Sequence, residues 1–392
     1  MCMNIEKVYI GGWFQRTRLH LSEIYDFTRG YPSPIALDND KLNSYRGNMN
    51  IDSVELVVDN LEYIYLKTGV IDLRIFEDGL IILETYHSHD LQRDIDILTE
   101  YYERRLSPAL KYLFSLGAPV PKELANIKTV YPYFVETTDT EPERVEQLFA
   151  EFSQGNYSTE HKDGYDLYRA DTLYVINRRA ITSEDARRFI EEKIFLKEFR
   201  GQLHRYLNLH RTIWEEIAKV NECGRLRGKD IPEHKERIDC YAKTISFIAT
   251  RIDQMDTYLH TRQKILLNDN RLISFNTELA YHHETMSDSL DYVKDIWNLT
   301  QNYVKTAQKV FTELVAKSTN NSVHNLTVVT SMGVGATLIG LFTVTDLPTI
   351  SWFSMSYFIA LAFFGYMVNR ILKIWSENKS YGITHIDVDK DI

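Results

Sequence analysis

Two long uncharged stretches near the end of the chain constrain its fold more than any other feature. The first runs from Leu326 to Thr345 and the second from Ile350 to Asn369, and neither contains Asp, Glu, Lys or Arg. Each has about twenty residues, the length that a helix needs to cross the hydrocarbon core of a membrane. A buried core helix is the alternative, but such helices usually keep a polar stripe, and the second stretch is apolar on every face. We therefore predict two membrane-spanning helices, at 326–345 and 350–371.

The charges around these stretches predict their orientation. The connection from Asp346 to Thr349 is so short that only a tight hairpin fits, so both long ends of the chain lie on one side of the membrane. Lys317 precedes the first stretch, Arg370 and Lys373 follow the second, and the hairpin has no Lys or Arg. Positive charge marks the cytoplasmic side. We expect a multi-pass protein of the cell inner (plasma) membrane with both termini in the cytoplasm.

Composition excludes several classes of protein. The formal net charge of -10 argues against direct nucleic-acid binding, which needs a basic face. Cys2, Cys223 and Cys240 are too few and too scattered for a disulfide framework or a zinc site, as is usual in a reducing compartment. The first residues lack the basic and apolar regions of a signal peptide, so we expect that the soluble part is not exported. No Ser-His-Asp or Cys-His signature emerges, so we expect no enzyme.

The remaining chain divides by pattern into two regions. Asp78-Gly79 lies between two strand-like runs, 70–76 and 80–86, which predicts a hairpin because Gly supplies the positive φ of a tight turn. Helical stretches interrupt further strand-like runs. We predict an α+β cytoplasmic domain over 1–181, a long helical stalk region over 182–325, the two transmembrane helices within 326–372, and a cytoplasmic tail over 373–392.

The last stalk helix carries a heptad seam. Its apolar positions alternate in steps of four and three, as in a coiled coil: Met286, Leu290, Val293, Trp297, Thr300, Val304, Ala307, Phe311 and Leu314. A second apolar row lies beside the seam: Tyr292, Ile296, Leu299, Tyr303 and Val310. Packing against helices of the same chain and packing in a ring of stalks from several copies both explain the seam, and continuity with the membrane stretch favours the ring.

This order of elements resembles the CorA family of magnesium channels. The resemblance rests on a soluble α/β domain, long stalk helices and two spans, and on Asn320, which precedes Leu326-Thr327 as an Asn precedes a Leu-Thr pair at the start of the family's pore helix. It implies a homo-oligomer, pentameric by analogy, within a lipid membrane. The positions that match pore-lining sites of the family are Asn320, Val323, Leu326, Val334 and Thr337.

One departure from the family pattern is serious. The family's Gly-Met-Asn signature is absent, and Val344-Thr345-Asp346 occupies its place. Asp346 at the outer pore mouth could form an acidic ring that attracts cations, or could only cap the span. This loss is similar to a divergent CorA-like branch associated with type III CRISPR systems, whose members look like membrane effectors gated by a nucleotide messenger. No phosphate-binding loop is present, so phosphate contacts would need scattered side chains such as Arg178, Arg179, Arg225 and Arg227.

Acidic residues at helical spacing on the stalk are the candidate metal ligands. In CorA relatives, carboxylates of the soluble domain bind regulatory divalent ions between subunits, which implies Mg²⁺ at Asp288, Asp291 and Asp295. A solvated helix face is the alternative reading.

We therefore hypothesise a cation-conducting, homo-oligomeric channel that a ligand gates through the cytoplasmic domain. The divergent branch suggests a small nucleotide messenger as that ligand and an antiviral CRISPR effector as the role. The sequence predicts no ligand-binding residues. The alternatives are a constitutive divalent metal (magnesium) transporter and a non-conducting, membrane-anchored signalling or scaffold protein.

Overall fold

The computed structural model describes residues 5–14, 20–32, 37–88, 90–113, 133–152, 156–221, 225–343 and 352–382. The chain separates into two compact units, each discontinuous in sequence. Unit 1 comprises Met1–Asn208 and Phe247–Asp295, and unit 2 comprises Leu209–Ser246 and Ile296–Ile392. The two units are defined by contacts between residues, whereas the domain boundaries predicted from the sequence rest on residue patterns. Those predicted boundaries stay a prediction.

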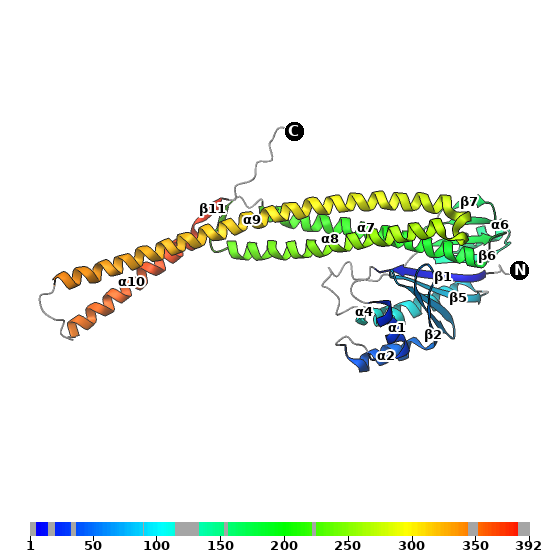
Figure 1. Ribbon diagram of the computed structural model, residues 1–392, viewed down its shortest axis with the longest axis horizontal. Coiled ribbons are helices and arrows are strands. Elements are labelled where there is room, and N and C mark those ends of the chain that lie inside the picture. The colour runs from blue at the N-terminus through cyan, green and yellow to red at the C-terminus, as the bar shows by residue number, and fades with distance from the viewer. Residues whose placement is uncertain are drawn as a thin grey trace, which may run out of the picture. The chain divides into compact units, whose positions relative to one another are not determined.

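Unit 1 is built on a mixed sheet whose nine strands have the order β2-β3-β4-β5-β1-β6-β9-β8-β7 (Figure 1). Strands β6 and β9 are parallel, and the other neighbouring pairs are antiparallel. The strands are β1 (Ile5–Trp13), β2 (Ile51–Val57), β3 (Tyr63–Thr68), β4 (Ile71–Phe76), β5 (Leu80–Ser88), β6 (Tyr133–Thr138), β7 (Ser158–Lys162), β8 (Tyr165–Arg169) and β9 (Leu173–Arg178). The predicted mixture of strands and helices in this region is confirmed.

The hairpin predicted at Asp78-Gly79 is present between β4 and β5. Gly79 has a φ of 93°, a conformation that side chains disfavour. The Asp78 carboxylate accepts a hydrogen bond from the backbone N–H of Leu80 at 3.1 Å, which closes the turn. The register then pairs Ile75 with Ile81.

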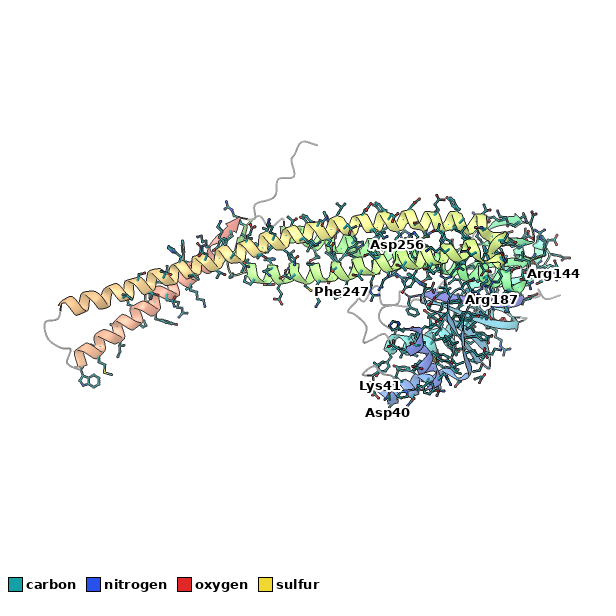
Figure 2. All side chains as sticks on the ribbon, viewed as in Figure 1. Asp40, Lys41, Arg144, Arg187, Phe247 and Asp256 are labelled. Carbon is teal, nitrogen blue, oxygen red and sulfur yellow. The ribbon has the colours of Figure 1, made fainter. Side chains whose placement is uncertain are left out.

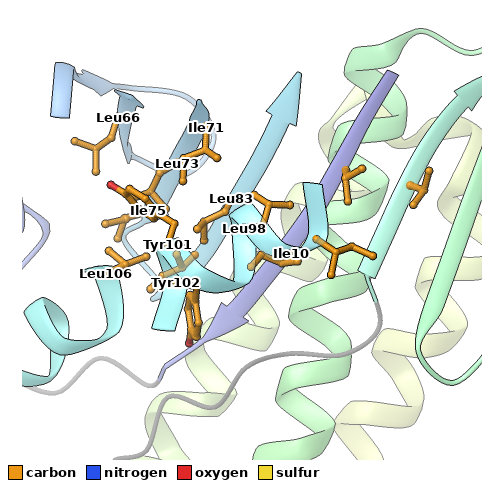
Figure 3. Packing of buried hydrophobic residues seen from close by; sticks show 14 of the residues in the cluster. Ile10, Leu66, Ile71, Leu73, Ile75, Leu83, Leu98, Tyr101, Tyr102 and Leu106 are labelled. Carbon is orange, nitrogen blue, oxygen red and sulfur yellow. The ribbon is translucent and has the colours of Figure 1, made fainter. Parts of the chain in front are cut away.

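One face of the sheet packs against short helices. Side chains alternate across a strand, so Val8 and Ile10 of β1 enter the core on this face. Figure 3 shows Leu98 and Leu106 of the covering helices over the strands that carry Leu73 and Leu83. The helices of unit 1 before the long ones are α1 (Leu21–Arg29), α2 (Asn39–Met49), α3 (Leu91–Tyr101), the π-helical turn η1 (Tyr102–Leu106), α4 (Ser107–Leu113) and α6 (Pro142–Phe152).

The opposite face packs against the start of a long helix. The Trp13 ring lies 5.6 Å from both Phe195 and Phe199 of α7, measured between ring centroids. Strand β4 is buried along its whole length, as expected for a strand covered on both faces. The three long helices are α7 (Ser183–Asn221), α8 (Ile231–Asn268) and α9 (Asn276–Thr343), and the short 3₁₀ segment η3 (Asn270–Phe275) joins the last two.

Gly11 sets the close approach between β1, β5 and α7, and we predict that Gly11→Ala destabilises the protein by about 1 to 3 kcal/mol. A Cβ atom at this position would lie 2.7 Å from the carbonyl oxygen of Ile81 and 2.9 Å from the Cγ2 atom of Ile194. The carbonyl belongs to the strand backbone, so the sheet itself must shift. Urea denaturation of the purified protein measures this cost.

The matched control is Gly47→Ala in α2, where an added Cβ meets nothing within 4 Å. That substitution should be neutral or stabilising by up to about 1 kcal/mol, because Ala loses less backbone entropy than Gly. Equal effects of the two substitutions would contradict the packing argument for Gly11.

The heptad seam of α9 is buried within the chain. All nine of its side chains are buried, with Leu290, Thr300 and Phe311 fully so. In unit 2, Trp297 contacts the ring of His210 on α7 at 5.4 Å, and Phe311 contacts His234 on α8 at 6.3 Å. Packing against helices of the same chain therefore accounts for this seam, and a ring of stalks is not needed for it. The second row is partly covered: Tyr292 is 61% and Leu299 is 67% exposed, whereas Ile296, Tyr303 and Val310 are half-buried.

The C-terminal part of the chain continues as helix. α9 ends at Thr343 and α10 spans Trp352–Asn378, so α10 extends beyond the predicted end of the second span. The predicted hairpin connection and Asp346 lie outside the described residues. Within the residues that the structure describes, no helix combines the length and the apolar character needed to cross a membrane.

A small two-stranded sheet in unit 2 was not expected from the sequence. Strand β10 (Arg225–Arg227) pairs antiparallel with β11 (Ser380–Gly382) after α10. The Tyr381 hydroxyl accepts a hydrogen bond from the Asn321 side chain at 3.1 Å, which ties β11 to α9. Three-residue strands carry too little pattern for a sequence argument.

Candidate functional site

The predicted pore-lining residues lie on the C-terminal part of α9. Asn320 is exposed, and Val323 and Val334 are each 54% exposed. Leu326 and Thr337 belong to the helix, but their side chains lie outside those that the structure describes. Their role in a pore stays a prediction.

The predicted metal ligands Asp288, Asp291 and Asp295 are all exposed on α9. The ammonium of Lys294, on the same helix, lies 2.7 Å from the carboxylate of Asp256 on α8 (Figure 2). It lies 3.9 Å from the carboxylate of Asp291. The described residues include no group of three or more His, Cys, Asp or Glu side chains that could hold a metal ion. The Mg²⁺ sites implied by the resemblance lie between subunits, so they stay a prediction.

The arginines considered for phosphate contacts do not form a common site. Arg178 pairs with Glu136 at 2.6 Å and also with Glu6. Arg179 pairs with Asp166, a residue of β8. Arg225 and Arg227 stand exposed on β10 in unit 2.

A cationic cavity in unit 1 is the candidate functional site. It has a volume of about 310 Å³ and lies between α7, the strands β8 and β9, and the first turns of α9. Its lining residues are Arg169, Tyr174, Lys193, Leu196, Lys197, Arg200, Gly201, His204, His282 and Met286. None of these ten described residues is Asp or Glu.

The cations of the cavity come mainly from one face of α7. Lys193, Lys197, Arg200 and His204 follow one another at steps of four, three and four residues, which is the spacing that brings side chains to one helix face. Arg169 reaches the same place from the end of β8. Helix periodicity and sheet topology together concentrate the positive charge.

The two innermost cations are neutralised by carboxylates of α9 and β7. Glu278 pairs with the ammonium of Lys193 and lies 3.8 Å from the guanidinium of Arg169, which also pairs with Glu160 of β7. Burial lowers the pKa of Lys193, and the charge of Glu278 opposes this effect only in part. His282 lies 3.9 Å from Glu278 through its Nε2 atom. Its burial, together with the charge of Lys193, lowers its pKa to about 4, so the imidazole is neutral at pH 7.

The two outer cations, Lys197 and Arg200, face the cavity without such neutralisation. No ion pair involving either side chain is found in the part of the chain that the structure describes. Burial lowers the pKa of Lys197 to about 8, and the more distant charges of Glu198 and Asp171 offset only part of that effect. The Glu198 carboxylate accepts a hydrogen bond from the backbone of Trp13.

Apolar groups complete the wall. Leu196 and Met286 are buried beside the cations, and Tyr174 contributes an aromatic ring. Gly201 leaves the wall open, because a Cβ atom at this position would meet nothing within 4 Å. A second cavity of about 420 Å³ shares Arg200, His204 and Met286 with the first and continues between α7 and α9.

A second group of buried charges lies elsewhere in unit 1 and is structural. Arg262 of α8 is 2% exposed, pairs with Asp78 of the β4–β5 turn and lies 2.6 Å from Glu192 of α7. His283 of α9 lies 3.4 Å from Glu192. These groups join four elements and open onto none of the cavities described above.

The cavity was missed at the level of the sequence, although part of its signal is there. The cationic stripe from Lys193 to His204 can be read from helical spacing alone. Arg169 and His282 cannot be added to it without knowing that the end of β8 and the start of α9 meet α7.

Comparisons with solved structures find distant likenesses at low TM-scores. The CorA magnesium transporter from Methanocaldococcus jannaschii shares 10% identity at a TM-score of 0.31, over 64% of this chain and 91% of that one. The soluble domain of the same CorA shares 9% identity at a TM-score of 0.24, over 47% and 88% of the two chains. The full-length CmaX protein shares 13% identity at a TM-score of 0.29, over 62% and 88%. Neither a protein-family model nor a curated protein matches the chain.

Proposed function

We propose that this chain is a non-catalytic membrane protein that assembles with copies of itself into a ligand-gated cation channel. One observation carries the proposal: α10 exposes large apolar side chains along its whole length. Those that are at least 47% exposed are Trp352, Met355, Ile359, Phe363, Phe364, Tyr366, Met367, Ile371, Ile374 and Trp375. Exposing an apolar surface of this size to water is unfavourable in free energy, so we expect lipid or another protein chain to cover it.

The sequence supports lipid as the covering partner. The stretches 326–345 and 350–369 have no charged residue, and Lys317, Arg370 and Lys373 stand at the ends that would face the cytoplasm. Tyr366 and Trp375 fit the aromatic belts found where a helix leaves the hydrocarbon region. The proposed location is therefore the plasma membrane.

Within this proposal α9 lines the pore and α10 faces lipid. α9 carries Asn320, Val323 and Val334 exposed on its surface, and small and hydroxyl-bearing residues such as Gly333 and Thr337. Apolar rings narrow a pore by excluding water, and Asn and Thr offer oxygen atoms to a hydrated ion. Because α9 is one continuous helix from Asn276 to Thr343, ligand binding near its first turns can act on its last turns.

Charge substitutions at Val334 test the pore. In planar bilayers we expect Val334→Glu to raise and Val334→Lys to lower the single-channel cation current by roughly twofold or more, since a fixed charge at a constriction acts directly on permeating ions. Lys264→Glu on the exposed side of α8 is the control, and it should leave the current unchanged.

The outcomes separate this proposal from its two competitors. Current that is absent from every preparation, with and without candidate ligands, would mean a membrane anchor and would sink the channel. Rescue of a magnesium-requiring strain by the wild-type chain, without any added ligand, would indicate a constitutive magnesium transporter. A gated antiviral effector predicts no rescue and toxicity only when its nucleotide messenger is present.

A further inference from the structure

We infer that the cationic cavity of unit 1 is a binding site for a small phosphate ester, with Lys197 and Arg200 as its phosphate-recognising residues. The cavity is defined by the ten residues named above, and its four Lys and Arg side chains differ in their partners. Arg169 pairs with Glu160 and lies near Glu278, and Lys193 pairs with Glu278. Neither Lys197 nor Arg200 forms an ion pair among the described residues.

The chemistry of these two side chains favours phosphate. Lys197 and Arg200 are three residues apart on α7, so they stand next to each other on the same helix face. A guanidinium group presents paired N–H donors that match two oxygens of one phosphate, and an adjacent ammonium adds a point charge. Hydrogen bonds to charged groups of this type are about twice as strong as neutral ones.

The shape of the cavity favours an ester over the bare ion. Its volume of about 310 Å³ is far more than inorganic phosphate needs, and it lies at the lower end of ligand pockets, which span roughly 300 to 1,000 Å³. Leu196, Met286 and Tyr174 form the wall beside the cations and offer an apolar and aromatic surface to an organic group. The expected ligand is thus a phosphate monoester of about the size of a nucleoside monophosphate.

A solvated basic stripe is the competing explanation, and the burial of Lys197 speaks against it. A lysine that only keeps a helix soluble extends its ammonium into water, where its pKa stays near 10.4. Lys197 instead is partly buried beside Arg200 and Lys193, with its pKa lowered to about 8. Holding a cation in this position costs free energy in the empty site, and a bound anion would recover it.

Binding of the ester to the cavity does not depend on whether the chain conducts ions. The cavity contains His282 and Met286 from α9, so a bound ester would touch the helix that we propose to line the pore. Control of the channel by the ester rests on the proposed function, whereas binding of the ester does not. A chain that binds the ester and conducts no ions would keep this inference and remove the channel.

Calorimetric titration of the purified full-length chain in detergent micelles tests the site, with adenosine 5′-monophosphate as the probe and adenosine as the uncharged comparison. We expect the monophosphate to bind and adenosine to bind at least roughly tenfold more weakly, because the phosphate supplies the charged hydrogen bonds. Lys197→Met and Arg200→Met should each weaken binding of the monophosphate by roughly 10- to 100-fold. Lys264→Met, which removes the same charge from an exposed position on α8, should not change it.

Gly201 allows a test that leaves every charge in place. Gly201→Trp should abolish binding by filling the cavity, while Gly201→Ala adds one methyl group in open space and should preserve both the fold and the binding. Far-ultraviolet circular dichroism and melting of both variants verify that they are folded. Unchanged affinity in the folded Gly201→Trp variant would place the monophosphate elsewhere and overturn the inference.

The dependence on pH adds a readout that a purely structural lysine would not give. A bound dianion raises the pKa of Lys197, so affinity should be highest between about pH 6, near the second pKa of a phosphate monoester, and about pH 8. Above this range affinity should fall by up to about tenfold per pH unit. The charged groups around Lys197 are Lys193, Glu198 and Arg200 on α7 and Asp171 between β8 and β9, with the neutral His282 on α9. The fall should be absent in Lys197→Met. Absence of binding by the wild-type chain, or equal affinity for adenosine, would also overturn the inference.

Discussion

Replacing Arg262 by methionine is expected to lower the free energy of unfolding by about 3 to 5 kcal/mol, one of the two largest losses that we predict for a single substitution. Arg262 is 2% exposed and holds two carboxylates, Asp78 and Glu192, that are themselves buried. Burial alone would lower the pKa of Arg262 and raise that of Glu192. The charges of Asp78 and Glu192 outweigh the first effect, and Arg262 together with His283 outweighs the second. Methionine fills a similar volume and leaves two buried negative charges without their counter-ion.

Urea denaturation of the detergent-solubilised protein measures the loss, and two further variants identify its cause. Arg262→Lys keeps the positive charge and should cost less than Arg262→Met. The triple variant Arg262→Met, Asp78→Asn, Glu192→Gln has no unpaired charge and should recover part of the lost stability, because neutral groups cost less to bury. If the triple variant were less stable than Arg262→Met alone, the explanation by uncompensated charge would be wrong.

Trp297→Ala is expected to cost about 3 to 5 kcal/mol, since it empties the volume of a large buried side chain. Trp297 is 1% exposed and lies in the middle of the α9 seam, with its ring 5.4 Å from that of His210 on α7. His210 also bonds the hydroxyl of Thr300 at 2.7 Å, one turn further along the seam. Thermal and urea unfolding of the variant should show this loss.

The stability loss of Trp297→Ala, measured at several protein concentrations, distinguishes packing of the seam within one chain from packing between copies. The structure buries the seam within one chain, so the difference between Trp297→Ala and the wild type should be the same at all protein concentrations. Tyr292→Ala, at a 61% exposed position on the same helix, is the control and should change stability by less than about 0.5 kcal/mol. A cost of Trp297→Ala that grows on dilution would show that the seam joins different copies, as the ring of stalks requires.

Local signals predicted those features that depend on neighbouring residues. Asp78-Gly79 predicted the hairpin between β4 and β5 because positive φ at Gly79 is a local requirement. The heptad seam from Met286 to Leu314 predicted a helix over these residues, and α9, which carries the seam, runs from Asn276 to Thr343. Three-residue strands such as β10 and the ends of α10 escaped prediction, because strand pairing and helix ends depend on partners far along the chain.

The candidate cavity likewise combines features that residue spacing reveals with features that depend on distant partners. Spacing alone places Lys193, Lys197, Arg200 and His204 on one face of α7, and the sequence could have revealed this stripe. The arginines that were considered first, Arg178 and Arg179, are engaged by carboxylates of the sheet, which no spacing rule foretells.

The sequence by itself determined which stretches are uncharged, where the long helices run and which of their faces are apolar, because charge and periodicity are properties of consecutive residues. Only the tertiary structure decided that the α9 seam packs inside the chain, and that Arg169, Tyr174 and His282 meet the cations of α7 around one cavity. The physical reason is that burial and charge balance depend on distances between elements, and residues more than a hundred positions apart come together only when the sheet and helices pack.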